Sequence, residues 1–203
     1  MILQVDHISK AFGDHQVLSD LTFGVASGEV TGLLGANGAG KTTLLRIVTR
    51  LLEPDSGRVL FDGHPLTQSD LQQIGYLPEE RGLYRRMRVG EQALYFTQLK
   101  GMSRTAAETA LHTWFDRLGM ADWWQRPAGK LSKGMQQRLQ FVVTVAHNPR
   151  LVILDEPFSG LDSVGTDTLK GEIVRLKGEG AAILLSTHNL QAANELCDKT
   201  IQL

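Results

Sequence analysis

Two patterns of hydrophobic and polar residues divide the chain of 203 residues. Short, β-branched and partly alternating segments, which are typical of strands, lie at residues 2–5, 16–25 and 58–61. Nearly continuous apolar runs, which are typical of strands buried on both faces of a parallel sheet, lie at residues 30–34, 151–154 and 181–185. The pattern therefore predicts an α/β protein with a mostly parallel sheet.

Helical spacing follows these runs. Six apolar residues after Lys41 fall on one helical stripe that ends before Pro54, namely Leu44, Leu45, Ile47, Val48, Leu51 and Leu52. From Val89 to His147 the spacing is helical throughout, without a strand-like run. A helical block inside an α/β pattern predicts one domain over residues 1–203, with a core of residues 1–82 and 148–203 and a helical insert at about 83–147.

Composition narrows the classes of function. Hydrophobic residues make up 42% and charged residues 21% of the chain, as is usual for globular proteins. The formal net charge of −1 gives no general reason to bind nucleic acid, which is not an expected partner. One cysteine, Cys197, excludes an internal disulfide framework. Because no apolar run approaches the roughly 20 residues that span a bilayer and no signal peptide is visible, we expect a cytoplasmic location.

A phosphate-binding loop is predicted at residues 35–42. Their sequence, GANGAGKT, matches the pattern G-x-x-x-x-G-K-[ST] between a predicted strand and a predicted helix. Glycines let backbone N–H groups turn toward phosphate oxygens, and a helix N-terminus adds partial positive charge. The predicted nucleotide ligands are Gly35, Asn37, Gly38, Gly40, Lys41, Thr42 and Thr43. Lys41 is expected to reach the terminal phosphates, and the Thr42 hydroxyl is expected to bind Mg²⁺.

Two carboxylates at the end of a buried strand complete the predicted catalytic site. Asp155 and Glu156 follow the apolar run at residues 151–154, where ionised groups are costly unless they are paired or bind a metal. Asp155 is expected to bind Mg²⁺, and Glu156 is expected to polarise the attacking water. His188 follows the apolar run that begins at residue 181; it is either a structural histidine or a contact for a γ-phosphate.

Together these segments resemble the nucleotide-binding domain of ABC ATPases over the whole chain. The most specific likeness is at residues 131–138, LSKGMQQR, which resemble the signature LSGGQ followed by Q-R. The resemblance implies a phosphate-loop NTPase core, an N-terminal antiparallel β lobe, an inserted all-helical subdomain and further chain after Leu203. It also implies that Asp155 binds the metal, that Glu156 is catalytic and that His188 is the switch histidine. Residues 159–162 then resemble the D-loop.

Two further consequences concern the nucleotide. Phe12 stands where the family places an aromatic residue that stacks on adenine, although a core or strand-edge position would also explain it. By the same resemblance, two domains meet head to tail with two ATP molecules between them. Ser132 and Gly134 of one subunit then face the phosphate loop of the other, because a hydroxyl, backbone N–H groups and a helix dipole suit an anion.

Three positions depart from the family pattern. Lys133 and Met135 replace a glycine and a glutamine of the signature, and Lys133 either adds charge near phosphate or points to water. Glu79 stands where the family has a glutamine that contacts Mg²⁺; a carboxylate can reach the metal but is repelled by phosphate. Residues 76–84, with the signature, resemble a bacterial export-type branch that includes sodium-efflux and drug-export ATPases.

The favoured hypothesis is an ATPase on the cytosolic face of the cell membrane that powers an exporter. Its expected partners are a second copy or a second ATPase subunit, and a transmembrane permease. One alternative is a soluble ABC ATPase that acts on ribosomes or DNA, although this chain lacks the second cassette or long coiled-coil insert of such proteins. The other is a non-hydrolysing nucleotide sensor, against which Glu156 and His188 argue. The arginines at 81, 85, 86 and 88 favour a solvated face or a permease contact.

Overall fold

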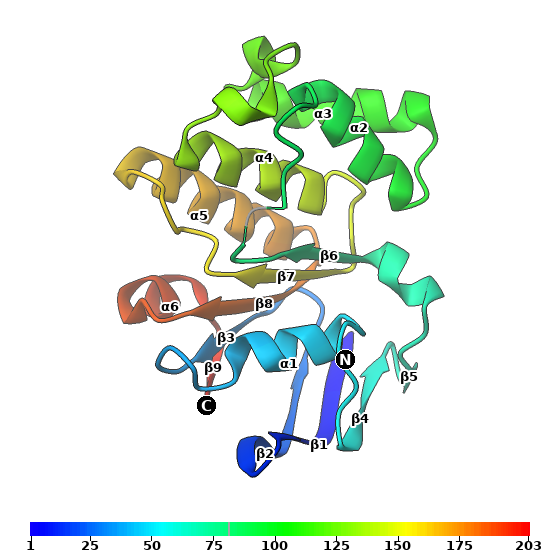
Figure 1. Ribbon diagram of the computed structural model, residues 1–203, viewed down its shortest axis with the longest axis vertical. Coiled ribbons are helices and arrows are strands. Elements are labelled where there is room, and N and C mark those ends of the chain that lie inside the picture. Colours follow the sequence, from blue (N-terminus) through cyan, green and yellow to red (C-terminus); the bar gives the residue numbers. More distant parts are fainter. Residues whose placement is uncertain (81) are drawn as a thin grey trace.

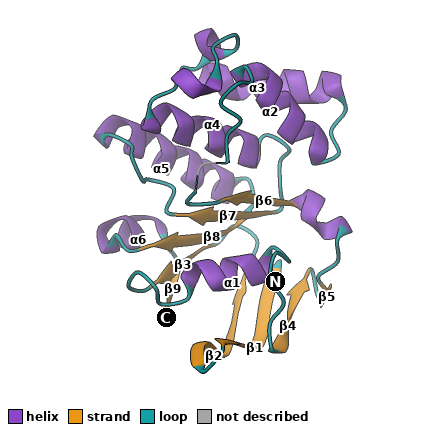
Figure 2. Cartoon of the chain, viewed as in Figure 1, coloured by secondary structure: helices purple, strands orange, loops and turns teal. Residues whose placement is uncertain are grey.

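The computed structural model describes residues 1–80 and 82–203 and contains two β-sheets with helices packed on them (Figures 1 and 2). Arg81, one of the four arginines noted above, lies outside the described residues. The antiparallel sheet has the order β2-β1-β4-β5, and the parallel sheet has the order β6-β7-β8-β3-β9.

The strands of the antiparallel sheet are β1 (Leu3–Phe12), β2 (His15–Val25), β4 (Ser56–Phe61) and β5 (His64–Pro65). Those of the parallel sheet are β3 (Val30–Leu34), β6 (Ile74–Leu77), β7 (Leu151–Asp155), β8 (Ala182–Thr187) and β9 (Lys199–Gln202). The helices are α1 (Lys41–Val48), α2 (Val89–Leu99), α3 (Arg104–Arg117), α4 (Lys133–Val145), α5 (Ser163–Gly178) and α6 (Leu190–Leu196). Short 3-10 helices lie at Ser69–Gln73, Ala121–Trp123 and Ala128–Lys130.

The parallel sheet is covered on both faces, which explains its nearly continuous apolar sequences. Successive side chains of a strand point to opposite faces. In β7, Leu151 and Ile153 therefore join the core that includes α1 and the antiparallel sheet, whereas Val152 and Leu154 join the core built with helices α2 to α5. Helix α1 lies between the two sheets, and α5 covers the opposite face of the parallel sheet (Figure 1).

Helices α2, α3 and α4 form a group at the end of the molecule far from the antiparallel sheet (Figure 2). Their shared core includes Phe115 and Phe141, each no more than 1% exposed. The described residues between Val89 and His147 contain α-helices and short 3-10 helices but no strand, as the spacing predicts. The expected fold class is thus confirmed, while the division into core and insert stays a prediction.

Strands β1, β5 and β6 differ from the sequence prediction, β5 being a two-residue strand that the pattern does not predict. Strand β1 continues to Phe12, well beyond the apolar segment at residues 2–5, because it pairs with β2 on one side and β4 on the other. Strand β6 was not predicted from the pattern, since it is only four residues long and contains Gly75. It is formed by parallel pairing with the buried strand β7, which a sequence pattern does not reveal.

Candidate nucleotide-binding site

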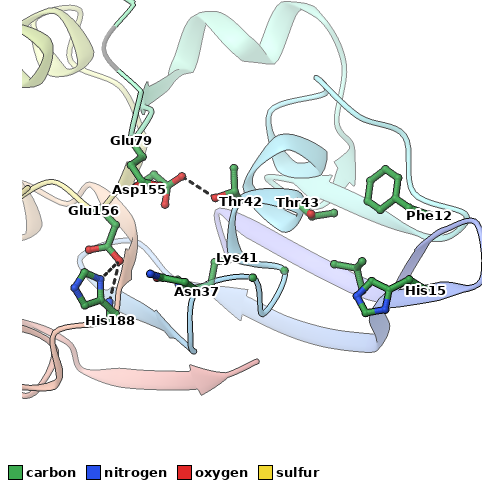
Figure 3. Close-up of a pocket in the computed structure, with 13 residues that line it drawn as sticks. Phe12, His15, Asn37, Lys41, Thr42, Thr43, Glu79, Asp155, Glu156 and His188 are labelled. Atoms are coloured by element: carbon green, nitrogen blue, oxygen red, sulfur yellow. Dashed lines mark hydrogen bonds and ion pairs between the residues drawn. The ribbon is translucent and has the colours of Figure 1, made fainter.

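The carboxyl ends of four parallel strands meet at one edge of the sheet, which is where ligands bind in α/β proteins. Strand β3 leads into the phosphate loop, β6 leads to Glu79, β7 ends at Asp155 and β8 leads to His188. A cavity of about 390 Å³ lies there (Figure 3). It is lined by Phe12, His15, Val17, Asn37, Gly38, Gly40, Lys41, Thr42, Thr43, Glu79, Asp155, Glu156 and His188.

The phosphate loop forms a tight turn between β3 and α1. Gly40 precedes the helix with a φ of 99°, which is a conformation that favours glycine, and no side chain caps the helix there. The Lys41 side chain is buried, and its Nζ donates hydrogen bonds to the carbonyl oxygens of Gly35 at 2.6 Å and Ala36 at 3.0 Å. Gly35 does not line the cavity itself, but its carbonyl holds the lysine that does.

A buried carboxylate lies beside this loop. Asp155 is 1% exposed and accepts a hydrogen bond of 3.3 Å from the hydroxyl of Thr42. Burial raises the pKa of Asp155 above its ordinary value, and the negative charges of Glu79 and Glu156 raise it further. A carboxylate in this setting favours a neighbouring cation, so its environment fits the predicted magnesium site.

The protein supplies only part of that metal site. Thr42, Asp155 and Glu79 all line the cavity and offer oxygen atoms, the ligands that Mg²⁺ prefers. Among the described residues, no group of three or more histidines, cysteines, aspartates or glutamates is placed to hold a metal ion. This fits a metal that is held by one or two carboxylates and completed by phosphate oxygens.

Glu156 is held in a defined orientation at the end of β7. Its backbone has a φ of 48°, which is uncommon for a residue with a side chain. One carboxylate oxygen accepts from the backbone N–H of His188 at 2.9 Å and lies 2.7 Å from the imidazole Nδ1 of His188 (Figure 3). The other oxygen accepts from the Thr187 hydroxyl at 3.3 Å. A fixed carboxylate beside a phosphate loop can accept a proton from a water molecule.

The far end of the cavity is formed by the β1–β2 hairpin (Figure 3). Phe12 is 51% exposed and lines the cavity, so it is a surface residue rather than a core residue. His15 pairs directly with Phe12 across the hairpin, and Val17 lies on the same strand. Sequence analysis missed both residues; the signal was the turn at Gly13 and Asp14, which places residues 12 and 15 opposite each other.

Ser132 and Gly134 lie in a second hollow, of about 420 Å³, which shares no lining residue with the first. It is lined by Ser132, Lys133, Gly134, Met135, Arg138, Gly160, Leu161 and Asp162. Ser132 caps α4, since its hydroxyl oxygen accepts from the backbone N–H of Met135 at 3.2 Å. We call this second hollow the signature hollow. The structure thus brings eleven of the fourteen predicted site residues to the lining of one cavity and leaves Gly35, Ser132 and Gly134 outside that lining.

The buried strand β3, the phosphate loop and α1, with Asp155 and Glu156 at the end of β7 in the same sheet, define a phosphate-loop nucleotide-binding protein. The chain belongs to the ABC transporter family, because the family model described as "ABC transporter" matches residues 18–159. A second family model, of an AAA domain, matches residues 125–194. The resemblance to ABC ATPases that the sequence motifs indicate is therefore confirmed.

Relatives with known names agree with this assignment. The chain is 44% identical over 197 residues to the uncharacterized ABC transporter ATP-binding protein YhaQ of Bacillus subtilis, covering 97% of this chain and 66% of that protein. It is 30% identical over 213 residues to the lipopolysaccharide export system ATP-binding protein LptB of Haemophilus influenzae, covering 98% of this chain and 85% of that protein. The chain thus spans slightly less than two thirds of the Bacillus relative.

A solved structure described as the ATP binding subunit of an ABC transporter superposes closely. Its TM-score is 0.93 at 32% sequence identity, and the match covers 100% of this chain and 86% of the other. In the part of the chain that the structure describes, no helix is both long and apolar enough to cross a membrane.

Proposed function

We propose that this chain is the ATP-binding and ATP-hydrolysing subunit of a bacterial ABC exporter. The observation that carries the proposal is the cavity in which three strand ends and the phosphate loop bring Lys41, Asp155 and Glu156 together. A buried ammonium, a buried carboxylate and a fixed carboxylate are the groups that phosphoryl transfer to water requires.

The side chains of the cavity divide the chemistry of ATP hydrolysis among them. Lys41 and the phosphate loop bind the terminal phosphates, while Phe12 offers a ring face to the adenine. Glu156 accepts a proton from the attacking water as the water oxygen bonds to the γ-phosphorus and the bond from that phosphorus to the bridging oxygen breaks, which releases ADP. His188 holds the Glu156 carboxylate through Nδ1 and contacts the γ-phosphate.

Thr42, Asp155 and Glu79 would hold Mg²⁺, with phosphate oxygens as its further ligands. When bound, this cation neutralises negative charge that builds up on the phosphates during transfer. The Thr42 hydroxyl lies within hydrogen-bond distance of the Asp155 carboxylate, so two of the predicted Mg²⁺ ligands are adjacent in the folded chain. Glu79 adds a negative charge where the family has a neutral amide, which strengthens the requirement for a cation before phosphate can bind.

The signature hollow supports a head-to-tail dimer that forms when ATP binds. Lys133 and Arg138 bring positive charge to it, and α4 begins there without an acidic residue in its first turn. Ser132 and Lys133 are exposed, so a second copy can approach them. The phosphates held by one copy would then contact the signature hollow of the other.

Export from the cell requires a membrane partner, which we propose to be a transmembrane permease on whose cytosolic face the dimer sits. The name of the Haemophilus relative, an export system ATP-binding protein, supports this role. Within the exporters, we propose the branch that the sequence motifs liken to sodium-efflux and drug-export ATPases.

The test combines hydrolysis with purification of the full-length protein from detergent-solubilised membranes. We expect magnesium-dependent ATP hydrolysis and a polytopic membrane protein in stoichiometric amount. Co-purifying ribosomes or nucleic acid would instead favour a soluble ABC ATPase. A membrane partner without any hydrolysis by the complex would favour a nucleotide sensor.

A further inference from the structure

One face of α4 is polar although it is buried. Gln137, Gln140 and Thr144 follow one another at helical spacing and are 1%, 4% and 5% exposed. A helix packed on a sheet usually presents apolar side chains at such positions. Buried amide and hydroxyl groups need hydrogen-bond partners, so the identity of those partners indicates what the polar face does.

Each of these side chains donates to a backbone carbonyl at the edge of the parallel sheet where the nucleotide site lies. Gln137 Nε2 donates to the carbonyl of Pro157 at 2.9 Å, and Gln140 Nε2 lies 3.5 Å from the carbonyl of Glu80. Thr144 Oγ1 lies 3.4 Å from the carbonyl of Tyr76, its stronger bond being within its own helix. Of these three bonds from α4 to the sheet edge, the one from Gln137 has the length of a strong hydrogen bond.

The acceptor of that bond directly follows Glu156. The turn at Glu156 has a positive φ, and its backbone bonds include Glu156 N–H to the Ser186 carbonyl at 3.0 Å and Ser159 N–H to the Glu156 carbonyl at 3.1 Å. An uncommon backbone conformation persists only where its surroundings hold it. The hydrogen bond from Gln137 in α4 therefore stabilises the conformation of this turn.

The contact also links Glu156 to the helix that begins at the signature. Near the start of α4, a Cβ atom added to Gly134 would lie 3.2 Å from the Gly160 carbonyl, so α4 packs closely against the segment that follows Pro157. The Pro157 residue is itself buried, which excludes water as a ready substitute for the amide of Gln137.

We propose that Gln137 is a positioning residue for Glu156, an inference that rests on the proposed ATPase function. By bonding the Pro157 carbonyl, Gln137 sets the direction in which the Glu156 carboxylate points. A shift of α4 relative to β7 is thereby transmitted to the carboxylate that accepts the water proton. The side chain of Gln137 itself does not line the nucleotide cavity.

The test uses Gln137→Met in the full-length protein, because methionine keeps the length of glutamine and removes the donor. We expect kcat to fall roughly tenfold to a hundredfold, the cost of a small misplacement of a catalytic group, with KM for ATP unchanged. Gln137→Asn, which withdraws the amide by one methylene group, serves as a second variant and should lose kcat similarly. Wild-type kcat in a folded variant would overturn the proposal.

The matched control is Gln140→Met, which removes a buried glutamine from the same helix one turn later. A general weakening of α4 would lower kcat in both variants equally, and that result would overturn the positioning role. We expect Gln140→Met to keep kcat close to that of the wild type, because its bond to Glu80 is long. Thermal unfolding of each variant checks that α4 remains packed.

A double-mutant cycle separates positioning from other effects. In a Glu156→Gln background, Gln137→Met should cause no further loss of single-turnover hydrolysis, because the group that it positions is already gone. Additive losses would overturn the proposal. A wild-type protein that does not hydrolyse ATP even with its membrane partner would overturn the proposed ATPase function. An active wild type with an equally active Gln137→Met variant would overturn only the positioning role of Gln137.

Discussion

Helices α1 and α4 both begin at a group suited to bind phosphate, but they differ in what surrounds them. At α1 no side chain caps the helix, and the buried Lys41 is held by carbonyls of the loop. The walls of its cavity come from the hairpin, the phosphate loop and the ends of β6, β7 and β8. At α4 the cap is Ser132, and in the described part of the chain the signature hollow is lined by Ser132, α4 and residues 160–162.

The charges at the two helix starts differ as well. The nucleotide cavity at the start of α1, which we call the α1 cavity, is lined by one lysine and three carboxylates among the described residues. This combination suits a nucleotide that binds together with a divalent cation. The signature hollow contains Lys133 and Arg138, while its single carboxylate, Asp162, caps α5 by accepting from the N–H of Gly165. The comparison teaches that the first site has the groups to bind a nucleotide within one chain, whereas in the proposed dimer the signature hollow would receive phosphates held by another copy.

Lys41→Ala should have the largest effect, because among the described residues it removes the one ammonium that lines the α1 cavity. Nucleotide binding and hydrolysis should both be lost, with hydrolysis falling more than roughly a thousandfold. Equilibrium binding of a fluorescent ATP analogue and steady-state phosphate release measure the two losses. Lys170→Ala, which removes a surface ion pair with Glu195, is the matched control and should leave both unchanged. Normal binding by Lys41→Ala would contradict the assignment of the phosphate loop.

Glu156→Gln should separate the two functions of the α1 cavity. The amide keeps the shape of the carboxylate but cannot accept a proton from water, so ATP should still bind while hydrolysis falls roughly a hundredfold to ten thousandfold. Binding and single-turnover hydrolysis measured on one preparation provide the comparison. If the variant hydrolyses ATP normally, the proton is accepted elsewhere and Glu156 is not catalytic.

The sequence predicts the residues of the phosphate loop and the carboxylates of the α1 cavity better than the residues contributed by the hairpin and by α4. Lys41 and Thr42 belong to one contiguous loop whose geometry is set locally, and Asp155 ends a buried run, so their roles can be read from short segments. His15 and Gln137 depend on strand register and on how α4 lies against the turn after β7. Contacts between segments that are distant in the sequence leave no local sequence pattern. Strand β6, which pairs with the distant strand β7, is not predicted for the same reason.

Ser132→Arg should break the signature hollow without touching the α1 cavity. A large cation at the start of α4 should leave ATP binding by the monomer intact and prevent ATP-driven dimerisation, which also lowers hydrolysis. Sedimentation in Glu156→Gln protein with ATP measures the dimer without turnover. Ser103→Arg is a matched control, since Ser103 caps α3 in the same way, by accepting from the Ala106 N–H at 3.2 Å. An ATP-driven dimer in Ser132→Arg would contradict the composite site.

The smallest expected effects are on stability, and they have opposite signs in the nucleotide cavity and in the signature hollow. Asp155→Asn should raise the free energy of unfolding of the nucleotide-free protein at neutral pH, because burial raises the pKa of Asp155 and its ionised form is therefore a cost to the folded state. Ser132→Ala removes a helix cap and should lower the free energy of unfolding by about 1 kcal/mol. Urea unfolding without magnesium measures both.

The pH dependence of the Asp155→Asn gain tests its cause. A raised pKa means that the folded state holds the Asp155 proton more tightly than the unfolded state does, so the cost appears as pH rises above the ordinary value of 3.8. The gain from asparagine should therefore be full at neutral pH and shrink as pH falls toward that value. Asp198→Asn is the control of opposite sign, because its ion pair with Lys177 lowers the pKa of Asp198 and its charge stabilises the fold. If Asp155→Asn destabilises the protein as Asp198→Asn does, the negative charge of Asp155 is not a cost to the folded state. The carboxylates of the α1 cavity would then not need a cation to neutralise them.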